Sequence, residues 1–319
     1  MRYTLQRVGQ FIIVFVVVTF VVMVATRIGS KDVARDLAGG AVSDALIERV
    51  NEDYPYLDKP LVVQYGYWLK DMATGNMGTS YAQSQEVVDM FKQRLPVTFF
   101  VGFWAIFLGL LIAVPLGVYS AYRRDGWVDR ISSYVSFAFI STPPLVFAVF
   151  LIYFVALRLD VFPVLSNYVA PWDNPVTHMK NFFLPSLSLG MGLAAVWTRF
   201  LRADMILTLQ SDFIMLARAK GMSPSRILWR HALRASILSL VTSVALQISS
   251  LVGGAVIAEQ FFGLAGIGTR LVFAVQANDI LVIQAITAVL VVTVVAVNLI
   301  VDLLYAVIDP RIRHARVFA

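Results

Sequence analysis

The stretch Ile280-Leu-Val-Ile-Gln-Ala-Ile-Thr-Ala-Val-Leu-Val-Val-Thr-Val-Val-Ala-Val-Asn-Leu-Ile-Val301 decides the fold class of this chain. It contains no charged side chain, and nearly all of its residues are apolar. A helix needs about 20 mostly apolar residues to cross the hydrocarbon core of a bilayer. The stretch therefore predicts a membrane-spanning helix.

Further charge-free stretches of similar length occur along the chain. They run over 8–26, 95–122, 131–157, 181–198 and 235–258. The composition agrees, because 59% of the residues are hydrophobic and only 14% are charged, against about 25% charged in soluble domains. The first stretch is long for the core of a cleaved signal peptide, so we expect it to be retained. The sequence thus predicts an all-α, polytopic membrane protein with six transmembrane helices.

The positions of Lys and Arg predict the orientation of these helices. Basic residues mark cytoplasmic loops because they resist translocation, and here they gather at both ends of the chain and in alternate loops. Both termini are therefore expected in the cytoplasm, with a long outer loop between the first two helices. The expected parts are a first transmembrane helix at 1–28, an extracytoplasmic loop or small subdomain at 29–94, a transmembrane domain at 95–310 and a cytoplasmic tail at 311–319.

Several function classes find no support in the residues. The chain has no cysteine, and His178, His231 and His314 lie too far apart in sequence to suggest a metal site. The segment 263–270 lacks the lysine of a phosphate-binding loop. The net charge of +6 is dispersed among loops, which argues against nucleic acid as a partner. We expect no enzyme, and neither a metal nor a cofactor bound by this chain itself.

The loop at 211–234 is the longest expected inner loop, and its pattern indicates two short helices joined by a sharp turn. Ser211 or Asp212 can cap the first helix, and Gly221 suits its C-terminal end. Ser223 and Pro224 then provide a cap and a first-turn proline for the second helix. A compact helix-turn-helix element is the expected structure.

Small residues in this element suggest a contact surface. Ala217 and Gly221 are four residues apart, so they are expected on one face that has almost no side chain. Arg218 and Lys220 flank that face. The element is suited to dock into a cleft of a soluble partner, and spacing alone leaves a simple surface loop as the alternative.

The run Phe213-Ile-Met-Leu-Ala-Arg-Ala-Lys-Gly-Met-Ser-Pro-Ser-Arg-Ile-Leu-Trp-Arg-His-Ala-Leu-Arg234 resembles the EAA loop of ABC importer permeases of the dipeptide, oligopeptide and nickel subfamily. Met215 stands where that motif usually begins with an acidic residue. Other stretches resemble the same subfamily: Arg94-Leu-Pro-Val-Thr98, Pro115-Leu-Gly117, Ser141-Thr-Pro-Pro144, Phe162-Pro163, Leu184-Pro-Ser186, Gly253-Gly254 and the ending 298–313.

The resemblance implies a permease subunit that forms half of the translocation pathway of an ATP-driven importer in the bacterial inner membrane. It implies that the loop couples to ATPase subunits through Ala217, Arg218, Ala219, Lys220, Gly221, Ser223 and Pro224. The implied partners are a second homologous permease, two ATP-binding subunits that hold ATP and Mg²⁺, and an extracytoplasmic solute-binding protein. Peptides are the expected solute; nickel or another small solute, or an ion-coupled secondary transporter, are the alternatives.

Polar residues inside the expected spans have two interpretations. Ser243, Gln247 and Ser250 fall on one face of a helix, where they would line a translocation path or pack against another helix. Asn298 and Asp302 are four residues apart near the end of the last span, and a structural role with a neighbouring arginine is expected for Asp302. Pro115, Pro143 and Pro144 are expected to kink or interrupt their helices.

Overall fold

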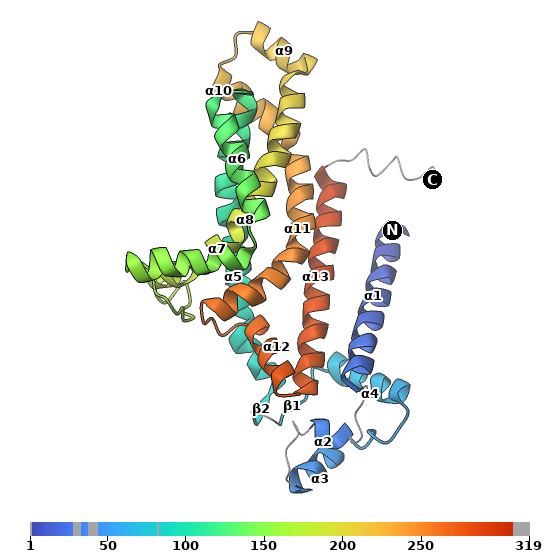
Figure 1. Cartoon of the computed structure of the whole chain (residues 1–319). Helices are drawn as coiled ribbons and strands as arrows, with labels where there is room; N and C mark the ends of the chain where they lie inside the picture. The colour runs from blue at the N-terminus through green and yellow to red at the C-terminus, as the bar shows by residue number, and fades with distance from the viewer. Residues whose placement is uncertain (1, 28–32, 38–43, 82, 309–319) are drawn as a thin grey trace. The chain divides into compact units, whose positions relative to one another are not determined.

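The computed structural model describes residues 2–27, 33–37, 44–81 and 83–308, which are mostly helical (Figure 1). The expected cytoplasmic tail at 311–319 lies outside these residues. The chain divides into two compact units. Unit 1 comprises Met1–Val97 and Ala265–Ala296, and unit 2 comprises Thr98–Leu264 and Val297–Ala319. Two long helices, α5 (Val87–Tyr122) and α13 (Ile280–Ile308), contribute residues to both units.

Unit 1 is built around the long helix α1 and short elements of the segment that follows it. Its elements besides the parts of α5 and α13 are α1 (Arg2–Arg27), α2 (Val33–Leu37), α3 (Asp44–Asp53), α4 (Leu61–Ala73), β1 (Thr79–Ser80), β2 (Gln85–Glu86) and α12 (Ile267–Gln276). The strands pair antiparallel, with Thr79 opposite Glu86. One of its apolar clusters joins Met23 of α1, Tyr65 and Trp68 of α4, and Ala288 of α13.

A buried ion pair ties remote segments of unit 1 together. Arg270 Nη2 donates to Asp279 Oδ2 at 3.0 Å and to Ser80 Oγ at 3.2 Å, while Ser80 Oγ donates to the same carboxylate oxygen at 2.5 Å. Arg270 Nε lies 3.3 Å from Met90 Sδ. Each of these four residues is only 2% exposed. The cluster connects β1, α5, α12 and the residue that precedes α13.

Unit 2 is a helical bundle with α8 as its central member. Its elements besides the parts of α5 and α13 are α6 (Trp127–Ser141), α7 (Pro144–Phe150), η1 (Leu151–Arg158), α8 (Pro175–Leu209), α9 (Asp212–Ala219), α10 (Pro224–Arg226), η2 (Ile227–Ala232) and α11 (Leu233–Phe261). Helix α8 packs against α6, α7 and α11. It also approaches α5 closely at Gly109, where an added Cβ would lie 2.7 Å from the ring of Trp197.

The apolar helices agree in part with the six predicted spans. Among the residues that the structure describes, four helices are long and apolar enough to cross a membrane, and counting a bent pair as one further span gives up to five. The four are Gly9–Arg27, Val87–Tyr122, Pro224–Ile248 and Ile280–Leu299. They coincide with the predictions at 8–26, 95–122, 235–258 and 280–301. The candidate Pro224–Ile248 begins well before the predicted start at residue 235.

The predicted span at 131–157 is not one continuous helix. Helix α6 ends at Ser141, and the segment Pro144–Arg158 leaves it at an angle of 104°. Pro143 and Pro144 have no backbone N–H to continue the hydrogen-bond ladder, and their rings restrict the residue before them. The expected interruption by these two prolines is confirmed, and the predicted continuous span is corrected to a broken one. Helix α5 continues through Pro115, so an interruption of the helix there is not found.

Helix α8 contains the predicted span at 181–198 but is not apolar enough to count among the candidate spans. Two of its buried polar side chains donate hydrogen bonds to backbone carbonyls within unit 2. Asn181 Nδ2 donates to the Asn167 carbonyl at 2.7 Å, and Ser186 Oγ donates to the Val101 carbonyl at 3.2 Å. A helix enclosed by protein can hold such groups because its neighbours satisfy them.

Candidate functional site

The loop predicted at 211–234 forms the expected helix-turn-helix, made of α9, a turn at Gly221, and α10 followed by η2. Figure 1 shows α9 and α10 at one end of unit 2, with α9 beyond the end of α8. Ser211 occupies the cap position of α9, but its hydroxyl donates to the Thr208 carbonyl at 2.6 Å instead of accepting from the helix. The backbone carbonyl of Ser211 accepts from Ile214 N at 3.0 Å, so the start of α9 is held through the main chain.

The turn after α9 confirms the prediction that Gly221 ends this helix. Gly221 has φ of +73°, which side chains with a Cβ rarely adopt. Gly221 N donates to the Arg218 carbonyl at 2.9 Å, and Met222 N donates to the Ala217 carbonyl at 3.2 Å. These two bonds define a Schellman motif. Ser223 and Pro224 then begin α10 at the predicted positions.

The inner face of α9 anchors the element to unit 2. Ile214 and Ala217 are buried in an apolar cluster with Met205 of α8 and with Ile227 and Leu228 of η2. The expectation that Ala217 and Gly221 share an exposed face is wrong for Ala217, which is only 6% exposed. Its small side chain instead lets α9 lie close to its neighbours within the unit.

The outer face of α9 carries large apolar side chains, whose exposure was not predicted from the sequence. Phe213, Met215 and Leu216 are all exposed, Leu216 by 57%. The signal was available: Phe213 and Leu216 share one face, and Ile214 and Ala217 share another. A short helix with apolar residues on two faces buries one in its own fold and leaves the other for a partner.

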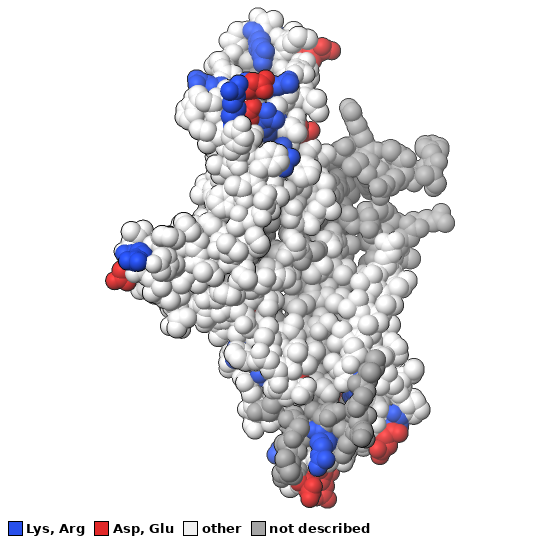
Figure 2. Space-filling view, in the orientation of Figure 1, with Lys and Arg blue, Asp and Glu red and all other residues white. Residues whose placement is uncertain are grey.

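Basic residues surround this apolar face. The predicted site residues that are exposed beside it are Arg218, Ala219, Lys220, Gly221, Ser223 and Pro224. Figure 2 shows Lys and Arg gathered, with fewer Asp and Glu among them, over the end of unit 2 that carries α9 and α10. The element therefore presents an apolar patch with a positive rim, which fits an apolar cleft with acidic groups at its edge.

An ion pair holds the base of this end of unit 2. Arg202 of α8 contacts both carboxylate oxygens of Asp129 in α6, with Nη2 2.7 Å from Oδ2 and Nε close to Oδ1. Asp125 N donates to the same carboxylate at 2.9 Å. The two-pronged contact fixes the start of α6 against the part of α8 that leads into α9.

We expect Asp129→Asn to destabilise unit 2 by about 1.5–3 kcal/mol. The substitution removes the charge from a nearly buried carboxylate whose two oxygens both accept hydrogen bonds from Arg202. The measurement is thermal unfolding of the purified chain in detergent. Asp125→Asn is the matched control, since that side chain is 79% exposed. Equal unfolding temperatures for the two variants would contradict the role given to Asp129.

The residues predicted to line a path do not share one open face. Ser243 is buried, Gln247 is half-buried and Ser250 is exposed, with Ser250 Oγ donating to the Gln247 carbonyl at 2.7 Å. Their role in translocation stays a prediction. Asn298 is exposed, and the side chain of Asp302 lies outside the part that the structure describes, so its expected ion pair is untested.

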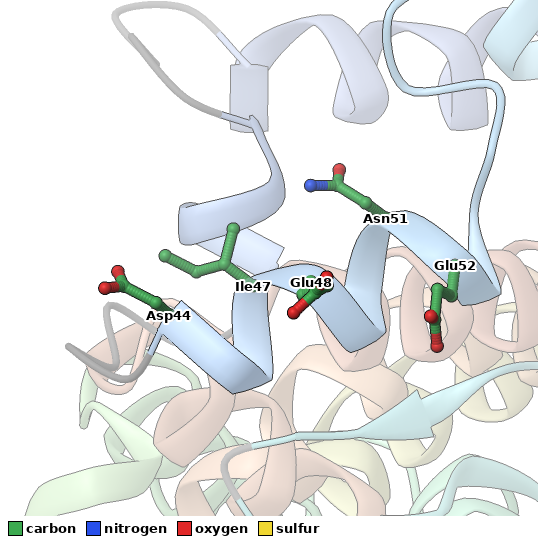
Figure 3. A pocket seen from close by; sticks show the side chains of 5 residues that line it. All are labelled: Asp44, Ile47, Glu48, Asn51 and Glu52. Carbon is green, nitrogen blue, oxygen red and sulfur yellow. The ribbon is translucent and has the colours of Figure 1, made fainter.

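An open depression on unit 1 is unrelated to this element. It lies beside α3 and is lined by Asp44, Ile47, Glu48, Asn51 and Glu52 (Figure 3). Within the described residues, no group of His, Asp or Glu side chains could hold a metal ion. The candidate site for partner binding is therefore the α9 to α10 element, which comes from unit 2 alone.

Long apolar helices with a polar, helix-turn-helix loop between two of them define a multi-pass helical membrane protein. Residues 113–314 match the model for the binding-protein-dependent transport system inner membrane component, and residues 1–102 match the model for the N-terminal part of such components. The chain belongs to this family of ABC importer permeases, and the resemblance to the peptide subfamily of these permeases is confirmed.

Named transport permeases are similar to this chain over most of its length. The dipeptide transport system permease protein of Lactococcus lactis is 36% identical over 258 residues, covering 81% of this chain and 82% of the relative. The glutathione transport system permease protein of Pectobacterium atrosepticum is 32% identical over 314 residues, covering 98% and 99%. The chain is thus a permease of the inner membrane.

A solved structure shows the same fold. A chain of the MetNI methionine ABC transporter, in an inward-facing conformation, superposes with a TM-score of 0.57 at 19% identity. The match covers 69% of this chain and 96% of that chain. In this family the ATPase resides in separate subunits, and substrate-binding proteins are the general partners.

Proposed function

We propose that this chain is the permease subunit of an ATP-driven peptide importer, and that α9 to α10 transmits the movement of an ATPase subunit to the transport helices. Peptides as the solute are supported by relatives whose names are dipeptide and glutathione transport permeases. The alternative that the protein transports nickel or another small solute is tested by the uptake experiment described below.

The observation that carries the coupling proposal is the two-faced packing of α9. Ile214 and Ala217 attach it to the cluster that contains Met205 of α8 and Ala232 of η2, while Phe213 and Leu216 face outward. A force on the outer face therefore reaches α8 and η2 through packed side chains rather than through a flexible loop. An element whose inner face is firmly packed and whose outer face is apolar is suited to bind in a partner's cleft and to transmit the partner's movement.

The proposed assembly has further parts. A second, similar permease completes the pathway, two ATPase subunits bind ATP and Mg²⁺, and a solute-binding protein delivers the solute from outside. Six spans with both termini in the cytoplasm and 29–94 outside are the topology that goes with this arrangement. The concentration of Lys and Arg around α9 and α10 supports it, because basic residues favour the cytoplasmic side.

Leu216→Asp tests the coupling element. A carboxylate in the middle of an apolar docking face costs more than about tenfold in affinity, so we expect co-purification of ATPase subunits to fall and peptide uptake to be lost. The measurement compares tagged wild type and variant purified from detergent-solubilised membranes. Leu159→Asp, which changes a leucine that is exposed to a similar extent and lies far from α9 in sequence, should leave both readouts unchanged.

Uptake of labelled solutes tests the substrate class separately. Cells that lack this chain should take up labelled di- and oligopeptides only when the wild-type chain is restored. If nickel uptake is restored and peptide uptake is not, the solute is wrong while the coupling role stands. If ATPase subunits fail to co-purify with the wild type, the coupling role itself is refuted.

A further inference from the structure

Helix α4 belongs to the segment expected outside the membrane, yet it packs against the apolar helix α1. Tyr65 of α4 shares its hydroxyl with Thr19 Oγ1 at 2.8 Å and donates to the Val16 carbonyl at 3.1 Å. Its ring meets that of Phe20 edge to face at 5.2 Å. Figure 1 shows α4 crossing the end of α1 within unit 1. One face of α4 is thus buried against a helix that crosses the bilayer.

The contacts also set the depth of α4. Thr19 lies eight residues before Arg27, the last residue of α1, which is about 12 Å along a helix that rises about 1.5 Å per residue. The Tyr65 hydroxyl lies several ångströms from the backbone of α4. The axis of α4 therefore lies nearer to the level of Arg27 than Thr19 does. Gln64 confirms this level, because its Oε1 accepts from Arg27 Nη1 at 2.6 Å. Helix α4 therefore lies at the boundary between hydrocarbon and headgroups.

The remaining face of α4 is apolar and flanked by lysines. Val62 is 69% exposed, and Val63 and Tyr67 are exposed as well. Lys59 precedes the helix, with Nζ 4.9 Å from the centre of the Tyr67 ring, and Lys70 lies exposed near its end. Apolar side chains beside an aromatic ring and lysines are the composition of helices that lie in a membrane interface.

We propose that α4 is an interfacial helix that binds the lipid surface at the Arg27 end of α1. Val62, Val63 and Tyr67 enter the boundary of the acyl chains, and Lys59 and Lys70 extend to lipid phosphates. The helix thereby anchors unit 1 to the membrane at a second place besides its spans. This inference holds whatever solute the protein carries.

Because the chain has no cysteine, a single label can be placed on it, and the unsubstituted complex treated in the same way gives the background from cysteines of the other subunits. We would label Val62→Cys with the fluorophore bimane in the full chain, with its co-purified subunits, in vesicles that contain nitroxide lipids. Val17→Cys, exposed in the middle of α1, is the deep control, and Glu48→Cys on α3 is the aqueous control. Nitroxide near the headgroup and nitroxide deep in the acyl chain report the depth of each label.

The expected result is that the label at 62 is quenched most by headgroup nitroxide, the label at 17 most by deep nitroxide, and the label at 48 only by iodide in the water. Quenching at 62 by iodide alone would overturn the proposal, because the face would then lie in water. Quenching by neither agent would also overturn it, since another protein would cover the face.

The lysines are tested in the same vesicles. Lys59→Gln with Lys70→Gln should reduce the headgroup quenching at 62. An equal reduction in pure phosphatidylcholine and in vesicles with phosphatidylglycerol assigns the lysines to phosphate in general, and a larger reduction with phosphatidylglycerol assigns them to anionic headgroups. No reduction in either composition refutes their part in binding.

Discussion

Gly221→Arg should detach the permease from its ATPase subunits. Gly221 has φ of +73° with open space around it, so arginine strains the backbone by about 1–2 kcal/mol and disturbs the Schellman turn between α9 and α10. The new side chain also projects from the surface that faces the partner. We expect more than a tenfold loss of co-purified ATPase, which is about 1.4 kcal/mol or more, and loss of uptake.

Gly75→Arg is the control for backbone strain in this experiment. Gly75 has φ of +84°, nothing lies within 4 Å of an added Cβ, and it ends α4 with the same pair of hydrogen bonds, to Met72 and from Asn76 to Asp71. The substitution strains the chain in the same way at a place that is not part of the coupling element. If both variants lose the ATPase, the loss reflects misfolding and not the surface around Gly221.

Arg270→Met should strongly destabilise unit 1. It leaves the carboxylate of Asp279 buried without its cation, and breaking a buried pair in this way costs about 3–5 kcal/mol. Ser80 alone cannot compensate a full negative charge. The measurement is thermal unfolding in detergent, with Arg49→Met on the exposed side of α3 as a control that should change stability by less than about 0.5 kcal/mol.

The double variant Arg270→Met with Asp279→Asn separates charge from packing. Asp279 Oδ1 accepts from Val282 N at 3.4 Å at the start of α13, and asparagine can keep this cap without the charge. We expect the double variant to recover much of the stability lost in Arg270→Met. A double variant as unstable as the single one would show that the shape of Arg270, rather than its charge, stabilises the cluster.

Local chemistry made the helical fold and the turn predictable. Charge-free stretches such as 280–301 indicate apolar helices because lipid excludes charge, and Gly221 indicates a turn because few other residues adopt positive φ. Pro143 and Pro144 likewise indicate the break after α6. In each case the residues that give the signal are the ones that form the structure.

Features that depend on distant partners were not predictable in this way. Asp129 with Arg202, and Arg270 with Asp279, form pairs that only the packing of several helices brings together. Ala217 and Leu216 are neighbours in sequence, and which of them faces the core depends on how α9 lies against α8 and η2. Tertiary contacts decide the burial of a short helix, so the local sequence shows that α9 has two apolar faces, and only the folded chain shows which of them is exposed.

The polarity of α8 bears on the order in which the protein is made. Helix α8 contains the buried polar residues Asn181, Ser186 and Thr198. Such a helix gains little free energy by entering lipid alone. Its partners α5, α6 and α7 precede it in the chain and are synthesised first, whereas α11 follows. Assembly during translation therefore favours entry of α8 against helices already in the bilayer, with α11 closing over its remaining side.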